Sequence, residues 1–332
     1  MNSSDTSRRD FLRKTAATAA ALASPALLQA EAEAKTPASE TLVKTFYDSL
    51  NDAQREALCF PFDHSLRKAI DNNWHITEQT IGQFLTADQN AMVREIFLNL
   101  HSEEYREAVI NQVAHDSGKR GFGASSVAIF GDPGTDEFEF VLTGRHCTRR
   151  ADGNSVKGRA FGGPIFYGHA ADGFNEGPDH KGNAYWFQAK RANEVYQMLD
   201  GKQQEQALLD RIRQERGSST IRLAGDGKEI PGLAVADMSA DQKDGVRKVL
   251  ADLLMPFRPE DVTESMALIE KGGFDNLHLS FAKKGDIGND GVWDNWMLEG
   301  PHMVWVFRGS PHVHTWVHIA DPDGPSDRDR RA

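Results

Sequence analysis

The chain has 332 residues, two cysteines, and 38 Lys and Arg against 49 Asp and Glu, which gives a net charge of −11. This length allows one large domain or two ordinary ones, and two cysteines exclude a disulfide scaffold or a four-thiolate zinc site. The acidic balance, with no basic cluster in the body of the chain, argues against a nucleic-acid or anionic-membrane partner, because both attract proteins through positive potential.

The amino terminus has the pattern of an export signal. Residues 7–14 contain Arg8-Arg9, then Phe-Leu and further positive charge, and residues 15–28 form a run of small residues broken by Pro25. This pattern resembles a twin-arginine signal, and the apolar run is too short and too mild to span a membrane. We predict a signal peptide over residues 1–34, followed by a mature protein that is periplasmic or secreted and has no membrane anchor. Its partner would be the twin-arginine translocation machinery, and the alternative is a disordered tail.

Four predicted helix starts share one motif, in which an apolar residue precedes a capping residue and a Gln follows three positions after the cap. The caps are Asn51, Thr86, Asp200 and Ser239, and their glutamines are Gln54, Gln89, Gln203 and Gln242. This spacing predicts capping boxes, in which cap and Gln side chains each accept the other residue's backbone N–H. The glutamines are 35 residues apart in the first pair and 39 in the second, which suggests an internal duplication.

A second repeated pattern supports the duplication. Residues 141–146 end in Gly144-Arg145-His146, and residues 297–302 end in Gly300-Pro301-His302, each after a corresponding pair of helices. Helix runs followed by strand runs favour an α+β fold. We predict two pseudo-repeated helix-then-β-hairpin halves, near 40–170 and 190–320. The halves pack as one domain over residues 35–320, and a disordered tail covers 321–332.

Two hairpins are predicted from alternating patterns. The first joins residues 126–130 and 137–142 through a turn at 131–134, and the second joins 303–307 and 312–319 through a turn at 308–311. In the first hairpin, alternation places Phe138, Phe140, Leu142 and His146 on one face. In the second, one face carries Val313, Thr315, Val317 and Ile319, and the other carries His312, His314, Trp316 and His318.

The clearest chemical signal is His312-x-His314. Residues i and i+2 of a strand lie about 6.6–7 Å apart on one face, so both imidazoles can reach one ion. His318 is about 13 Å from His314 along an extended strand and is excluded from that ion. A third ligand has to come from elsewhere, and the candidates are His146, His169 and then His302. The alternative is that these histidines only form hydrogen bonds inside the fold.

Other stretches carry weaker signals. Cys147 can be a soft ligand, a disulfide partner of Cys59 or a buried hydrophobe, and residues 161–169 can form either an aromatic pocket or a tight packed loop. Acid or base roles are open to the carboxylates Glu176, Asp179 and Glu299. The sequence has no Gly-x-Ser-x-Gly elbow, His-Glu-x-x-His motif, P-loop or Cys-x-x-Cys.

Several motifs follow one another in order along the chain: the Trp74 region, the helix starts with Leu-Thr-x-x-Gln, residues 128–133, residues 163–168 and His312-x-His314. In this order they resemble an uncharacterised bacterial and fungal family, the domain of unknown function 3500, and the resemblance covers nearly the whole mature sequence. The family pattern usually has Gly-His-His where this chain has Gly144-Arg145-His146. It also has an Arg just after the final His-x-His segment, where this chain has Val317-His318-Ile319. The resemblance implies no established activity.

These observations predict an exported metal-binding protein with one copper, zinc or iron ion held by His312, His314 and one or two of His146, His169 and His302. Such an ion would serve a metal-dependent oxidoreductase or hydrolase that acts on a small-molecule substrate. One alternative is a binding protein without catalysis, which holds a small ligand in an aromatic cleft that includes Trp305, Trp316 and Tyr167. Another is a structural role, with the histidine face buried.

Overall fold

The computed structural model describes residues 38–153, 155–170, 183–287 and 290–324. The predicted signal peptide, most of the predicted tail, and Glu176 and Asp179 lie outside these ranges. Within them, no helix is long and apolar enough to cross a membrane. Helices and strands are numbered in chain order from α2, the first helix in the described part of the chain.

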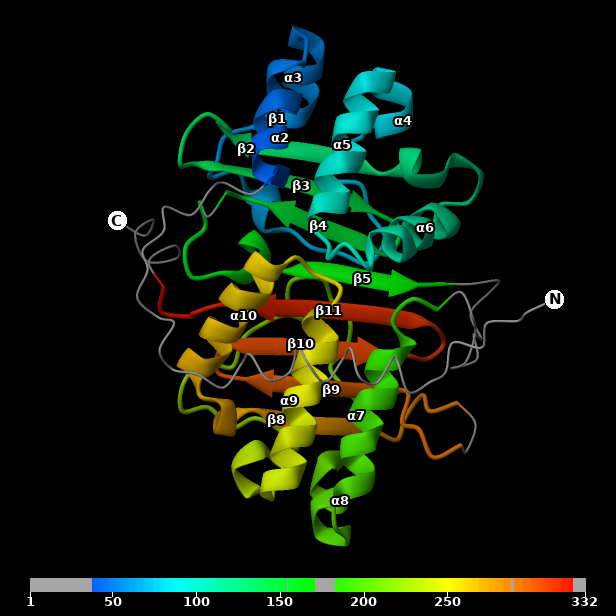
Figure 1. Cartoon of the computed structure of the whole chain (residues 1–332), viewed down its shortest axis with the longest axis vertical. Coiled ribbons are helices and arrows are strands. Elements are labelled where there is room, and N and C mark those ends of the chain that lie inside the picture. Colours follow the sequence, from blue (N-terminus) through cyan, green and yellow to red (C-terminus); the bar gives the residue numbers. More distant parts are fainter. Residues whose placement is uncertain (1–37, 154, 171–182, 288–289, 325–332) are drawn as a thin grey trace, which may run out of the picture. The chain divides into compact units, whose positions relative to one another are not determined.

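One mixed sheet runs through the described protein, in the order β1-β2-β3-β4-β5-β11-β10-β9-β8-β6, with β7 paired to β8 (Figure 1). The first-half strands are β1 (Cys59–Phe60), β2 (Ser126–Gly131), β3 (Phe138–Gly144), β4 (Cys147–Ala151) and β5 (Ile165–His169). The second-half strands are β6 (Leu208–Leu209), β7 (Leu233–Ala234), β8 (His278–Ala282), β9 (Asn295–Gly300), β10 (Met303–Arg308) and β11 (Val313–Ile319). Strands β5 and β11 are antiparallel and join the two halves into one sheet.

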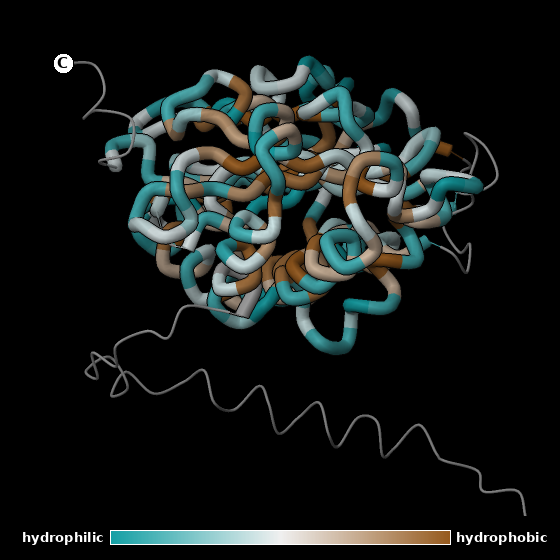
Figure 2. Tube along the Cα trace, turned by 90° about the horizontal axis from the view of Figure 1, so that it is seen from above, coloured by the Kyte–Doolittle hydropathy of each residue, from teal (hydrophilic) through white to brown (hydrophobic). Residues whose placement is uncertain are grey.

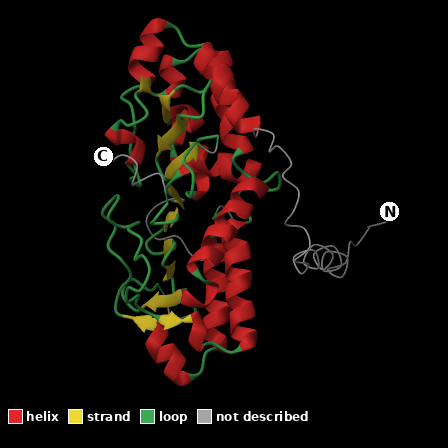
Figure 3. Ribbon diagram, turned by 90° about the vertical axis from the view of Figure 1, so that its left-hand side faces the viewer, coloured by secondary structure: helices red, strands yellow, loops and turns green. Residues whose placement is uncertain are grey.

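The α-helices cover one face of this sheet, as Figures 1 and 3 show. In the first half they are α2 (Ala38–Asp48), α3 (Asp52–Leu58), α4 (Ile81–Phe84), α5 (Ala87–Asn99) and α6 (Arg106–Asp116). In the second half they are α7 (Trp186–Met198), α8 (Gly201–Ala207), α9 (Ala240–Leu254) and α10 (Pro259–Gly272). Short 3-10 helices lie at Ser65–Lys68, Gly118–Ala124, Ala160–Gly162, Val235–Asp237 and Phe274–Asn276. Helices and one mixed sheet together confirm the predicted α+β class.

Side chains on the two faces of the sheet pack into different cores. The largest core lies between the sheet and the helices and includes Phe140, Tyr167 and Trp305. On the opposite face, which loops cover, Phe166 and Trp316 belong to a second cluster, and a third cluster lies beside β2 and β3. Hydrophobic stretches accordingly run through the interior, with hydrophilic ones outside (Figure 2). The sheet is therefore buried on both faces, and its central strands carry few exposed side chains.

All four predicted capping boxes are present. The capping glutamines also meet in pairs: Gln54 and Gln89 exchange two amide hydrogen bonds of 2.9 Å, and Gln203 and Gln242 exchange two of 2.8 and 3.1 Å. Each pair ties a short helix to a long one, α3 to α5 and α8 to α9. The two halves thus repeat the same contact as well as the same order of elements. The predicted domain limits, 35–320 with halves near 40–170 and 190–320, stay a prediction.

The predicted strand faces are found in both hairpins, with one exception. Phe138, Phe140 and Leu142 face the helices. His146 was expected beside them, but β3 ends at Gly144 and His146 has a φ of 55° in the β3–β4 turn. Because this left-handed residue breaks the two-residue alternation, the His146 ring lies against Phe166 of the loop-covered face instead.

Candidate metal site

Three histidine side chains meet on the loop-covered face, where β11 begins. The Nε2 atoms of His312 and His314 are 2.9 Å apart, and the His146 Nε2 lies 3.2 Å from the first and 3.1 Å from the second. All three residues are buried, with 5–6% of their surface exposed. In the described part of the chain, this is the one group of three or more His, Cys, Asp or Glu whose potential ligand atoms could converge on an ion.

Two backbone features bring the histidines together. His312 and His314 are two residues apart at the start of β11, so their rings leave the sheet on the same side. The β3–β4 turn carries His146 across β5, and the His146 N–H donates to the Asn72 carbonyl. Gly168 of β5 makes room for this crossing: a Cβ there would lie 2.3 Å from the Val313 oxygen and 3.4 Å from the His146 Cβ. A side chain at position 168 would therefore push the histidines apart.

Carboxylates fix two of the three rings from behind. The Nδ1 of His146 lies 2.7 Å from Asp116 Oδ2, and the Nδ1 of His314 lies 2.9 Å from Glu215 Oε2. Asp116 also accepts from the Ala170 N–H, and Glu215 pairs with Arg308 at 2.8 Å. Carboxylates behind imidazoles are typical of metal ligands, because a proton held on Nδ1 leaves the Nε2 lone pair free for the ion.

The electrostatics keep two of these rings neutral. Burial and the neighbouring His314, His146, Arg308 and Arg145 lower the pKa of His312 to about 3. Burial lowers the pKa of His314 to about 4, although Glu215 acts in the opposite sense. Neutral imidazole is the form that binds metals, so these rings are ready to act as ligands at neutral pH.

These shifts predict how the metal-free protein responds to acid. In the unfolded chain both histidines take up protons near pH 6.5, whereas in the folded chain they do so near pH 3 and 4. The unfolded state binds more protons between these values, so the free energy of unfolding should fall as the pH drops from about 6.5 towards 3, and should be fully restored above 6.5. Urea unfolding in the presence of a chelator at several pH values measures this fall. A His312→Gln plus His314→Gln variant should show a shallower fall, since buried His101 contributes equally to both proteins; parallel curves would contradict the prediction.

The other predicted ligands lie outside the group. The Nδ1 of His169 is 3.9 Å from Asp116 Oδ1, so this residue lies behind His146, beside the supporting carboxylate. His302 is in the β9–β10 turn, where its Nε2 is 3.8 Å from Asp226 and its ring packs against Gly272. His318, which the spacing excluded, lies 3.0 Å from the Ile221 carbonyl through Nδ1.

Three weaker sequence signals have structural explanations. Cys59 and Cys147 are both free, and burial raises the pKa of the Cys147 thiol to about 11, so Cys147 is the buried hydrophobe. Phe161 has a φ of 61° in a tight loop and is packed in the core. Glu299 is 1% exposed and forms an ion pair with Arg213. None of these residues joins the histidine group.

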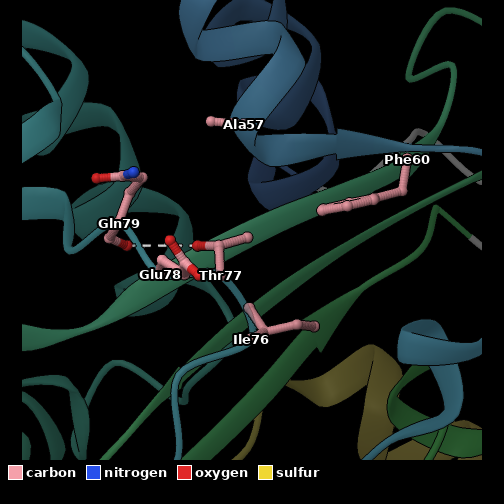
Figure 4. Close-up of a pocket in the computed structure, with 6 residues that line it drawn as sticks. All are labelled: Ala57, Phe60, Ile76, Thr77, Glu78 and Gln79. Atoms are coloured by element: carbon pink, nitrogen blue, oxygen red, sulfur yellow. Dashed lines mark hydrogen bonds between the residues drawn. The ribbon is translucent and has the colours of Figure 1, made fainter.

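A pocket also lies in the first half, and no member of the histidine group lines it. Its lining comes from α3, β1 and the segment 76–79, as Figure 4 shows, and includes Ala57, Phe60 and Thr77. The Thr77 hydroxyl is hydrogen bonded to the Gln79 and Val127 carbonyls. These contacts stabilise the segment 76–79, which forms one side of the pocket.

Sequence reasoning missed the two supporting carboxylates. Asp116 is the last residue of α6, and Glu215 lies in the loop segment after β6. Their histidine partners are 30 and 99 residues away in the chain, and no local pattern marks either pairing. Only the packing of α6 and of the covering loop against the sheet brings these two carboxylates to the histidines.

Asp116 offers a test of this supporting layer. Asp116→Asn keeps the side-chain size but removes the negative charge behind His146, so metal affinity should fall about 10–100-fold. Competition with a chromogenic chelator measures the change, and Asp88→Asn, an exposed substitution on α5, is the matched control. An Asp116→Asn protein with the wild-type affinity would show that the carboxylate does not support the ligand.

The fold and the site define the protein as an α+β protein with a buried three-histidine cluster backed by two carboxylates. The chain belongs to the family described as protein of unknown function (DUF3500), whose model matches residues 32–322. No curated protein and no solved structure is similar enough to extend the comparison.

Proposed function

We propose that this protein is an exported metalloenzyme with one copper, zinc or iron ion bound through Nε2 of His146, His312 and His314. The observation that carries the proposal is the triangle of three Nε2 atoms, each within 3.2 Å of the other two. Nitrogen ligands of a tetrahedral ion lie about 3.3 Å apart when the metal–nitrogen bonds are about 2.0–2.1 Å, so the triangle fits such an ion closely.

The donor chemistry also favours an ion over a hydrogen-bonded trio. When His146 and His314 donate from Nδ1 to Asp116 and Glu215, their Nε2 atoms both present lone pairs. These two atoms are 3.1 Å apart and cannot hydrogen bond to one another in that state. If all three rings are neutral, only the His312 Nε2 can carry a hydrogen, so at most one hydrogen lies among the three Nε2 atoms. A cation between them satisfies all three at once.

A catalytic role is favoured by the number of ligands. Structural zinc sites are closed by four protein ligands, whereas catalytic sites use three and keep a position for water or substrate. The described group contains three. The ion would serve as a Lewis acid that activates water or as a redox centre, which corresponds to a hydrolase or an oxidoreductase.

The shape of the triangle favours zinc or iron over copper(II). In a square-planar site two of three nitrogen ligands can lie opposite each other, about 4 Å apart, and copper(II) prefers such tetragonal arrangements. Here the largest Nε2–Nε2 separation is 3.2 Å, so the three ligands occupy one side of the ion. Copper nevertheless remains one of the three outcomes of the analysis below.

Export through the twin-arginine route is part of the proposal. It is supported by Arg8-Arg9 and the small-residue run over 15–28. This route carries folded cargo, often with a cofactor acquired before transport, which suits a metal site buried between distant parts of the chain. A periplasmic or secreted location follows from it, and the free Cys59 and Cys147 form no disulfide.

The alternative is a ligand-binding protein without catalysis. The aromatic residues suggested for its cleft do not line one, because all three are buried. Trp305 and Trp316 are 0% exposed and Tyr167 is 1% exposed. Trp305 and Tyr167 belong to the core under the helices, whereas Trp316 belongs to the cluster on the opposite face. Aromatic side chains on opposite sides of the sheet do not line a common cleft.

Elemental analysis of the mature protein, purified after export by its own signal, tests the proposal. We expect close to one zinc, iron or copper per chain, removal by dialysis against a chelator, and recovery when one equivalent of the same metal is added back. Since a ligand that binds only the folded state stabilises it, the reloaded protein should also melt at a higher temperature than the metal-free protein. Trace metal in the purified protein, together with no thermal shift on addition of zinc, iron or copper, would contradict the metalloenzyme assignment.

A further inference from the structure

We propose that the metal ion's open position receives a small oxyanion, such as a carboxylate-bearing substrate, and that Arg145 and Arg308 hold its negative charge. This inference rests on the proposed function, because it concerns the ligand of the same site. It is carried by two arginines that neighbour the histidine triangle, Arg145 beside His146 in the β3–β4 turn and Arg308 opposite His314 on β10.

Arg308 is held beside a metal-ligand candidate. It lies opposite His314 across β10 and β11, where the Cβ atoms of paired residues are about 4.5–5.5 Å apart. Its Nε donates to Glu215 Oε1 at 2.8 Å, and its Nη1 donates to the Ser310 carbonyl at 3.1 Å. A guanidinium has five N–H donors in a fixed plane, and a planar fork of this kind matches a carboxylate. Arg308 is therefore a fixed positive group at the edge of the site.

Arg145 is placed differently. It precedes His146 in the β3–β4 turn and its backbone pairs with Asn73. Its side chain is exposed and, among the described residues, has no ion pair or hydrogen bond of its own. Arg67, Arg150 and Arg213, in contrast, each pair with a buried glutamate.

Both arginines neighbour ligands of the proposed ion. Arg145 directly precedes His146, and Arg308 pairs with Glu215, whose other oxygen lies 2.9 Å from the His314 Nδ1. Arg145 thus has a guanidinium available for a ligand next to the histidine triangle.

The charges around the triangle do not balance once an ion is added. The two carboxylates behind the rings, Asp116 and Glu215, contribute two negative charges, and the neighbouring Arg145 and Arg308 contribute two positive ones. With neutral histidines, a divalent ion would leave an excess of two positive charges in a largely buried place, which is costly unless an anion compensates it. The chain as a whole carries −11, so this local excess is opposite in sign to the whole molecule.

Cobalt(II)-loaded protein tests the inference, because its visible absorption changes when a ligand enters the coordination sphere. We would titrate it with oxalate and, separately, with inorganic phosphate, to distinguish a carboxylate from a phosphate as the source of the oxyanion. We expect a saturable spectral change with at least one of them. Arg145→Gln should lower the affinity for that anion by about tenfold or more, since a charge-assisted hydrogen bond is lost. The cobalt content should stay at one ion per chain. Arg145→Lys should recover part of the affinity.

Arg94→Gln, an exposed substitution on α5, is the control and should titrate like the wild type. Bound cobalt with no spectral response to either anion would overturn the inference, as would an Arg145→Gln titration identical to that of the wild type. In both cases the proposed metal site would stand. If the wild-type protein bound no cobalt at all, the proposed function would fail and this inference with it.

Discussion

Replacing His146 with alanine should remove the bound metal, whereas replacing His302 with alanine should not. The two residues occupy equivalent turns of the repeated halves, β3–β4 and β9–β10, and both are buried, with 6% and 4% of their surface exposed. Only His146 has two other imidazoles within 3.2 Å. The pair therefore separates loss of a ligand from the general cost of truncating a buried histidine.

The expected size of the effect follows from the ligand count. Loss of a supporting residue behind a ligand costs about 10–100-fold in metal affinity, so loss of one of three direct ligands should cost more than about 100-fold. Elemental analysis and chelator competition on both variants, together with a His312→Ala plus His314→Ala double variant, measure this. Circular dichroism shows whether each variant is folded. A folded His146→Ala protein that retains one metal per chain would rule out His146 as a ligand, and metal loss in His302→Ala would show that burial alone explains the effect.

Local patterns were sufficient for much of the fold. Each capping box depends on residues three positions apart, and each strand face depends on residues two apart, so both can be read from short stretches of sequence. The pairing of Gln54 with Gln89 was not predicted. It arises because the repeated helices pack side by side, which brings two capping boxes together across 35 residues.

In the candidate site, too, local patterns predicted some residues, whereas others are brought in only by tertiary packing. His312 and His314 could be paired because they are neighbours on one strand, and His146 was a candidate because its turn recurs in the second half. The carboxylates Asp116 and Glu215 could not be found, because they come from a helix end and a loop that reach the histidines only through tertiary packing.

His302 shows where a repeat misleads. Strands β5 and β11 are antiparallel, so the equivalent turns of the two halves meet different strand ends. His146 lies near the start of β11, where His312 and His314 are. His302 lies near its other end, where its carbonyl accepts from the Ala320 N–H. The repeat preserves the turn but not its surroundings, and the three-histidine group therefore forms at one of two related positions in the described structure.

Replacing Glu139 with glutamine should cause a large loss of stability, because this carboxylate neutralises two buried arginines. Glu139 is 0% exposed on β3, and its oxygens lie 2.8 Å from Arg67 Nη1 and 2.5 Å from Arg150 Nη1. Breaking a buried ion pair by removing one partner costs about 3–5 kcal/mol, since the remaining charge stays buried without compensation. Urea unfolding measures the cost, and Glu137→Gln, two residues earlier and exposed, should change stability by no more than about 0.5 kcal/mol.

The same substitution should also weaken metal binding, although Glu139 is not a ligand. Arg150 donates to the carbonyls of Arg67 and Ala69, so the glutamate and its arginines hold the covering loop against the sheet. Three residues beyond Ala69, the Asn72 carbonyl accepts the His146 N–H and fixes the turn that carries this histidine. Loosening the loop should therefore let His146 move away from His312 and His314. A Glu139→Gln protein that unfolds more easily but binds metal with the wild-type affinity would show that the loop and the metal site are independent.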